Sequence, residues 1–199
     1  MKRSFKALLT AVLFAVPMLA SCNEAQGPIG PTSNIARQEA LVGDLIETSV
    51  DLVEGTIGQI GRILSGSDAK GDAVSAWIGS SGGTIRTAAY TLTVPAGAVS
   101  KNTKFTVAPT KSGLYTVDLH AYEQGLLGLV DVGANGFDKP VSLTISFANA
   151  NGPVDASKIV VVYIASPSKV QVQPSFVDLT KKTVSSPLSH FSKYAMVQD

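Results

Sequence analysis

Short segments with alternating hydrophobic and polar residues dominate the chain from residue 77 onward. Four apolar residues there occupy every second position, which is the spacing of a strand with one buried face: Val141, Leu143, Ile145 and Phe147. The almost continuously apolar run at 159–164 predicts a central strand buried on both faces. Turn signals separate such runs at 81–83, 95–97, 135–136 and 151–153. The pattern predicts a mainly β fold, an antiparallel β-sandwich over residues 77–199.

The sequence GGTIRTAAYTLTVPAGAV, at residues 82–99, predicts two short strands on either side of a tight Pro-Ala-Gly turn. Pro95 fixes φ and Gly97 permits the backbone geometry that such a corner needs. Asn135 and Gly136 predict a hairpin turn, after which Phe137 is expected to enter the core.

A helical period precedes this region. Six apolar residues follow a spacing of four and three, as on one face of a helix: Ile46, Val50, Val53, Ile57, Ile60 and Leu64. We therefore expect a helical segment over residues 34–64, although each glycine within it costs about 1 kcal/mol relative to alanine. The helix either packs on the sandwich or forms a stalk through which the chain self-associates. The polar residues 65–76 predict a hinge.

Residues 1–21 have the features of a lipoprotein signal peptide. A basic start precedes an apolar run that is too short for a lasting transmembrane helix. The run ends in LASC at 19–22, which resembles a bacterial lipobox and implies cleavage before Cys22 and acylation of that cysteine. The alternative is an ordinary secretory signal with an accidental cysteine. Residues 22–33 predict a flexible tether, and Asn23 in place of an aspartate favours the outer membrane in enteric-type sorting.

Composition and charge exclude several classes of protein. Hydrophobic residues make up 45% of the chain, too many for a wholly disordered protein. Without Lys2, Arg3 and Lys6 of the signal, 13 basic residues face 15 acidic ones, a net charge near −2. Such a balance argues against nucleic acid as a partner. The one cysteine excludes an internal disulfide.

Three motifs occur in order along the chain: GGTI…YTLTVPAGAV, DVGANGFDKPVSLTISF and SPLSHFSKYAMV. Together they resemble the ZU-five domain that zona-occludens and netrin-receptor proteins share, and the likeness covers residues 77–199. The animal domains usually carry two prolines where this chain has VPAGAV at 94–99. The resemblance implies a β-sandwich that acts as a non-enzymatic interaction or scaffold module and needs no cofactor.

The motif His190-Phe191-Ser192 carries the one candidate for bond-breaking chemistry. In some animal members of the family, a His-Phe-Ser tripeptide cleaves its own backbone. The resemblance implies that His190 would act as base or orienter, Phe191 would lose its carbonyl bond and Ser192 would be the nucleophile. The chemistry requires a strained Phe–Ser peptide. The alternative is a plain last strand, with His190, Ser192 and Tyr194 on one side.

Signals for ligand binding are weaker. Asp131, Asn135 and Asp138 crowd one segment and could offer oxygen ligands to calcium, but they lack EF-hand spacing and also fit ordinary turns. Five aromatic residues could form a sugar-stacking face or belong to the core: Trp77, Tyr90, Tyr115, Tyr122 and Tyr163.

The sequence as a whole predicts a lipid-anchored envelope protein that binds an unknown protein partner and is not an enzyme. A self-processing domain, and a sugar- or calcium-binding domain, are the alternatives.

Overall fold

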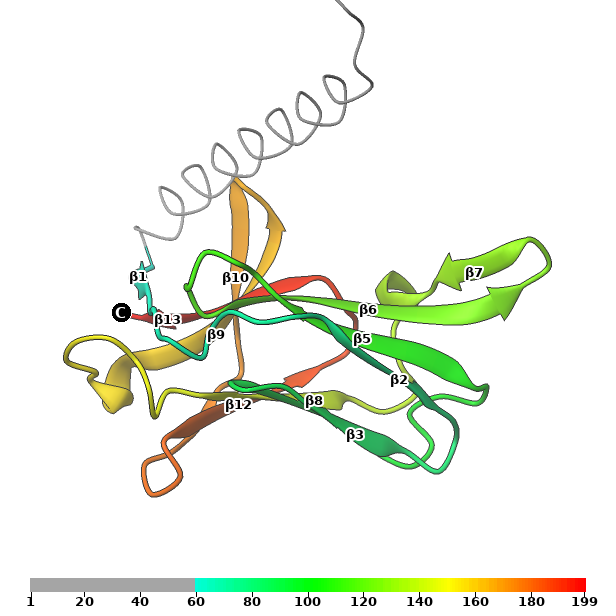
Figure 1. The fold of residues 1–199 in the computed structure, drawn as a ribbon, viewed down its shortest axis with the longest axis horizontal. Coiled ribbons are helices and arrows are strands. Elements are labelled where there is room, and N and C mark those ends of the chain that lie inside the picture. Colours follow the sequence, from blue (N-terminus) through cyan, green and yellow to red (C-terminus); the bar gives the residue numbers. More distant parts are fainter. Residues whose placement is uncertain (1–59) are drawn as a thin grey trace, which may run out of the picture. The chain divides into compact units, whose positions relative to one another are not determined.

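The structure is a computed structural model, and it describes residues 60–199. These residues form two antiparallel sheets that pack face to face as a β-sandwich (Figure 1). The predicted signal peptide, the tether and the part of the helical segment before residue 60 lie outside the described residues.

The larger sheet has eight strands, in the order β10-β9-β13-β6-β5-β2, with β1 beside β13 and β7 beside β6. The strand bounds are β1 Arg62–Ile63, β2 Val74–Ile78, β5 Thr103–Pro109, β6 Thr116–Gly125, β7 Gly128–Asp131, β9 Ile159–Ser166, β10 Lys169–Gln173 and β13 Lys193–Gln198. Two short 3-10 helices, η1 (Gly133–Asn135) and η2 (Ala156–Lys158), lie in connections.

The smaller sheet has five strands, in the order β11-β12-β8-β4-β3. Their bounds are β3 Gly83–Arg86, β4 Tyr90–Val94, β8 Val141–Ser146, β11 Phe176–Asp178 and β12 Thr183–Leu188. In Figure 1 this sheet is the lower layer.

The core lies between the two sheets and follows the predicted alternation. Val141, Leu143, Ile145 and Phe147 are all buried, and the residues between them face outward. Strand β5 shows the same period, with Phe105 and Val107 in the core. The predicted strand pattern is therefore confirmed.

Strands β9 and β13 are buried on both faces. Tyr194 and Met196 point into the main core. A second cluster covers the opposite face of the same strands, made of Val162, Ile164, Ala195 and Val197. The prediction of a central strand at 159–164 is confirmed, because β9 lies between β10 and β13.

The predicted helical segment 34–64 is wrong at its C-terminal end. Residues 62–63 form β1 and pair with Val197 and Gln198 of β13. Leu64 is fully buried in the main core, whereas Ile60 and Ile63 pack against the second cluster. Pairing with a strand that is distant in sequence therefore determines the conformation of residues 62–63.

The sequence predicts a hinge at residues 65–76, but these residues are part of the sandwich. Ser65 and Gly66 form bridges to Leu114 and Ala150. The carboxylate of Asp68 accepts hydrogen bonds from the Tyr115 hydroxyl at 2.6 Å and from the Asn149 amide at 2.9 Å. Burial and the hydrogen bond to Asp68 raise the pKa of Tyr115. The sandwich therefore begins near residue 62, earlier than predicted.

Two predicted turns have other roles. The Pro-Ala-Gly turn does not join β3 to β4; it follows β4 and leads toward β5 in the other sheet, with Gly97 at φ +75°. Asn135 and Gly136 do not close a hairpin, because they follow β7 of one sheet and precede β8 of the other. Phe137 packs against the main core, as predicted.

Candidate functional site

The motif His190-Phe191-Ser192 lies in the connection between β12 and β13, which carries the chain from one sheet to the other. The strand expected through this motif begins only at Lys193. Tyr194 faces the main core together with Phe191, so the expected grouping of Tyr194 with Ser192 and His190 on one strand face is wrong.

Backbone hydrogen bonds fix the connection at several points. The Phe191 amide donates to the Gly133 carbonyl at 2.8 Å, and the Ser192 carbonyl accepts from the Leu119 amide at 2.9 Å. The Tyr194 hydroxyl donates to the His190 carbonyl at 2.8 Å. Burial raises the pKa of Tyr194, which keeps this donor protonated. The connection is thus an ordered part of the fold.

The Phe191 ring belongs to an aromatic cluster in the core. Its centroid lies 4.6 Å from that of Phe137 and 5.6 Å from that of Phe105, both in edge-on geometry. The His190 ring packs edge-on against Tyr163 at 4.8 Å. Contacts with neighbouring aromatic rings therefore account for the positions of the His190 and Phe191 side chains.

His190 and Ser192 line different cavities. His190 borders a cavity of about 400 Å³ beside Asn135 and Asp138. Ser192 borders another, of about 390 Å³. Within residues 60–199, the only non-glycine residue with positive φ is Lys182. The described structure therefore contains neither a base–nucleophile pair nor backbone strain at this motif, and self-cleavage stays a prediction from the family resemblance.

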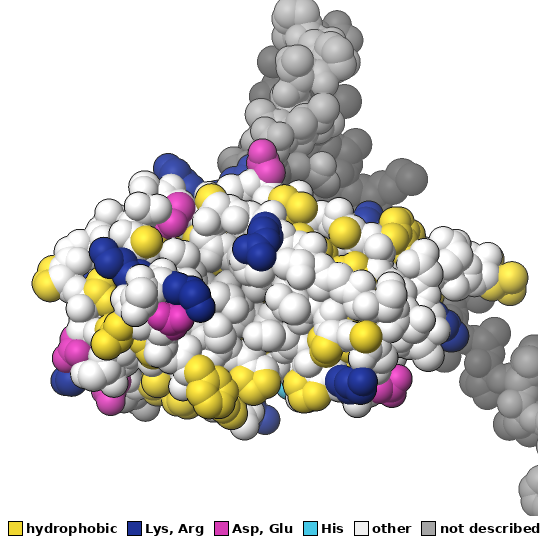
Figure 2. Space-filling model, turned by 90° about the horizontal axis from the view of Figure 1, so that it is seen from below, with side chains coloured by type: hydrophobic (Ala, Val, Ile, Leu, Met, Phe, Trp, Pro, Cys, Tyr) yellow, Lys and Arg dark blue, Asp and Glu magenta, His cyan; other side chains and the backbone are white. Residues whose placement is uncertain are grey.

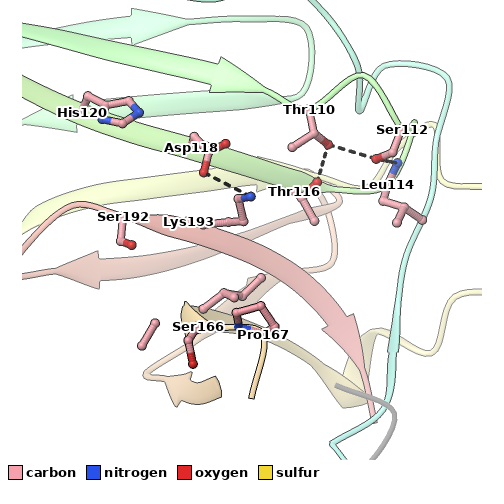
Figure 3. A pocket seen from close by; sticks show the side chains of 12 residues that line it. Thr110, Ser112, Leu114, Thr116, Asp118, His120, Ser166, Pro167, Ser192 and Lys193 are labelled. Carbon is pink, nitrogen blue, oxygen red and sulfur yellow. Dashed lines mark hydrogen bonds and ion pairs between the residues drawn. The ribbon is translucent and has the colours of Figure 1, made fainter. Parts of the chain in front are cut away.

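Figure 3 shows the cavity that Ser192 lines, on the outer face of the eight-stranded sheet. Lys193 lies 3.8 Å from Asp118 on the neighbouring strand. His120 also lines the cavity, but its Nδ1 pairs with Asp131 at 3.0 Å. Lys193 and Asp118 form an ion pair across the sheet, and His120 and Asp131 are hydrogen-bonded. No hydrogen bond within residues 60–199 joins either histidine to the Ser192 hydroxyl.

The calcium candidates are separated. One oxygen of Asp131 accepts from the Gly133 amide at 2.9 Å and the other pairs with His120, whereas Asn135 and Asp138 line the cavity beside His190. Residues 60–199 contain no group of three or more His, Cys, Asp or Glu side chains that could hold a metal ion. A calcium site stays a prediction.

The structure reveals a groove that the sequence reasoning missed, on the outer face of the five-stranded sheet. It has a volume of about 490 Å³, and hydroxyl side chains from three adjacent strands line it: Thr91, Thr93, Thr144, Thr183 and Ser185. We call this site the hydroxyl groove. Figure 2 shows this face, where uncharged polar side chains and backbone cover most of the surface.

Strand register creates the groove. Thr91 of β4 pairs with Thr144 of β8, which pairs in turn with Ser185 of β12. The Thr144 and Ser185 hydroxyls lie 2.8 Å apart and are hydrogen-bonded. Because side chains at paired positions point to the same face, the three hydroxyls form one row across the sheet. Phe176 continues the row beside Ser185 and is largely exposed.

Charges lie at the border of the groove. Lys181 pairs with Asp178 at 3.0 Å, and the Lys181 amide also donates to that carboxylate. The amide and the side chain of Lys181 lower the pKa of Asp178, which stays ionised. Arg86 lines the groove on the opposite side, next to Thr91 in the register. The groove is therefore nearly neutral within, with charged groups of both signs beside it.

The five aromatic residues considered for sugar stacking do not all share a face, although Trp77 and Tyr122 lie on the same face of the eight-stranded sheet. Tyr90 and Tyr115 are completely buried, while Trp77 is half exposed on the outer face of the other sheet. The signal that could have revealed the hydroxyl groove is the alternation of hydroxyl residues along three strands, as at Ser142, Thr144 and Ser146.

The chain matches no known protein-family model and no curated protein sequence. Among residues 60–199, no helix has the length and hydrophobicity required to span a bilayer.

Proposed function

We propose that this chain is a lipid-anchored protein of the bacterial cell envelope and that its β-sandwich is a non-enzymatic binding module. The hydroxyl groove is the observation that carries this proposal. It is a concave surface formed by regular secondary structure, so its polar groups are held in place before a partner arrives.

The chemistry of the groove favours a polar, uncharged contact surface. Each hydroxyl can donate one hydrogen bond and accept two, and the row therefore suits the amide and carbonyl groups of a protein partner. Phe176 adds an exposed apolar side chain at the end of the row. Aromatic side chains are among those that contribute most to binding at protein interfaces.

The proposed location rests on the sequence. The lipobox-like residues before Cys22 imply acylation and hence an anchor, and Asn23 favours the outer membrane. The similarity of three motifs to the ZU-five domain supports a scaffold or interaction role. We further propose that the predicted helical segment, from residue 34 to residue 59, either packs on the sandwich or mediates self-association.

Photo-crosslinking in the envelope tests the groove as the contact surface. A photoreactive amino acid at Thr93, an exposed position in the groove, is expected to give discrete adducts. The same group at Ser75, on the outer face of the other sheet, is the matched control. Thr144→Val in the Thr93 probe removes one hydroxyl at nearly constant volume and should reduce adduct yield several-fold. Equal adducts from both positions would contradict the proposal.

A further inference from the structure

The β6–β7 hairpin presents two leucines at its tip. Leu126 and Leu127 form the turn between the paired residues Gly125 and Gly128, and each leucine is 101% exposed. Leu129 and Val130 of β7 are about half exposed. Figure 1 shows this hairpin projecting beyond the rest of the sandwich. An exposed apolar cluster of this kind marks a contact surface.

The turn does not require leucine side chains at these two positions. Two-residue hairpin turns favour Asn, Asp and Gly, because one or both central residues adopt positive φ. Neither leucine has positive φ, and Gly128, at φ +129°, adopts the unusual conformation. Neither leucine belongs to the two hydrophobic clusters found among residues 60–199. Their side chains are therefore available to a partner outside the described chain.

We propose that this hairpin is a membrane-contact loop, with Leu126 and Leu127 buried in the interfacial region of a lipid bilayer. The tip is a small convex projection. A stable protein interface buries about 800 Å² on each partner, more than four aliphatic side chains provide. A bilayer accepts a projection of any shape, and each apolar group that enters it is stabilised.

A row of residues behind the tip supports a bilayer as the partner. Strand register places Trp77, Lys104 and Tyr122 side by side on the outer face of the eight-stranded sheet. Trp and Tyr favour the headgroup level of membranes, and Lys extends its ammonium group into that layer. Tyr122 precedes Leu126 by four residues, or about 13 Å along an extended strand. That separation suits a shallow insertion of the tip.

Charges near the hairpin largely cancel. Glu123 pairs with Lys101 at 3.1 Å, and Lys104 and Asp131, on either side of Tyr122 in the strand register, add one charge of each sign. We therefore expect binding to zwitterionic lipid, with little dependence on salt.

The chain between the predicted anchor and the sandwich is long enough for this contact. Cys22 and Ile60 are 38 residues apart, which corresponds to roughly 57 Å at helical rise and roughly 130 Å when fully extended. Strand β1 and the β6–β7 hairpin lie at opposite ends of the sandwich (Figure 1). The linking chain therefore allows the sandwich to lie along the bilayer. The inference rests on the proposed function in one respect: the lipid anchor would keep the hairpin close to a bilayer.

Fluorescence from a tryptophan at the tip tests the proposal. The full chain carrying Leu127→Trp and Trp77→Phe is reconstituted into phosphatidylcholine vesicles that contain brominated lipid. Blue-shifted emission, quenched by shallow bromine labels, is expected. The matched control Thr180→Trp, in the turn between β11 and β12, should show neither effect. Replacing Leu126 with serine should weaken lipid partitioning by on the order of tenfold.

Flotation of the vesicles separates this proposal from the anchor. If the chain floats and the emission of the introduced tryptophan is neither shifted nor quenched, the membrane-contact loop is refuted while the anchor stands. If the chain does not float, the anchor fails, and the loop is tested by titration with lipid. A shift that grows with lipid supports the loop, and no shift at millimolar lipid refutes it. A lipid-independent shift with doubled native mass would instead assign the tip to a second copy and overturn the proposal.

Discussion

Tyr90 links the stability of the sandwich to alkaline pH. Its ring is completely buried, and its hydroxyl lies 3.2 Å from the Ala69 carbonyl and 3.1 Å from the Thr116 carbonyl. Burial, followed by the nearby Tyr115 and Asp68, raises the pKa of Tyr90 above its ordinary value. The change Tyr90→Phe removes both the hydrogen bond and the ionisable group.

The two effects act at different pH. At pH 7 the variant should be less stable by about 1–2 kcal/mol, because a buried hydrogen bond is lost and a carbonyl is left unpaired. An unfolded tyrosine ionises near pH 10, whereas folded Tyr90 stays protonated. Its stabilising contribution is therefore complete below pH 10 and declines above it, by about 1.4 kcal/mol per pH unit, until the folded pKa is reached. Phenylalanine does not ionise, so the variant has no such loss. The free energies of unfolding of the wild-type protein and of Tyr90→Phe should therefore become equal near pH 11.

Guanidinium unfolding, followed by circular dichroism at pH 7, 11 and 12, measures both effects. At pH 12 the variant should be the more stable protein. Leu92→Val, a core change on the same strand without an ionisable group, should destabilise equally at each pH. If Tyr90→Phe remains less stable by the same margin at pH 12, the phenol of Tyr90 is not held neutral in the folded state and the reasoning fails.

Two further predictions concern the segments that the sequence misplaced. Asp68→Ala should lower the free energy of unfolding by about 2 kcal/mol, because it leaves the Tyr115 hydroxyl without its carboxylate partner. The control Asp72→Ala, at an exposed position, should change the free energy of unfolding by less than about 0.5 kcal/mol. Equal effects of the two variants in a denaturant titration would show that Asp68 does not stabilise the sandwich. Intact mass under denaturing conditions should show one uncut chain, since His190 and Ser192 line separate cavities. A fragment ending at Phe191, and absent from Ser192→Ala, would instead establish self-cleavage.

Strands with a local signal were predictable, and segments defined by distant partners were not. The alternation from Val141 to Phe147 requires only that one face of a strand be buried. Leu64 also fits the spacing of a helix face, yet it packs in the main core while its neighbour Ile63 packs against the second cluster, because pairing with β13 turns adjacent residues to opposite faces. Asp68 has the polarity of a linker residue, but its partners, Tyr115 and Asn149, are far away in sequence.

The candidate site shows the same division. The alternating hydroxyls of Thr91 and Thr93, and of Thr144, are visible in the sequence. They become a surface only through the strand order β12-β8-β4, which local patterns do not specify. His190 and Ser192 are two positions apart, and the resemblance to the His-Phe-Ser tripeptide of the ZU-five family suggested shared chemistry. The connection between the sheets instead directs them into separate cavities.

The position of β13 has a consequence for the order of folding. Although it is the last described strand in sequence, it lies between β9 and β6 and contributes Tyr194 and Met196 to the main core. The eight-stranded sheet cannot close until residues 193–198 have left the ribosome. A chain released without them would expose the edges of β6 and β9 together. Such a protein folds only after the whole domain has been synthesised, and it would therefore stay unfolded during the export that we propose for it.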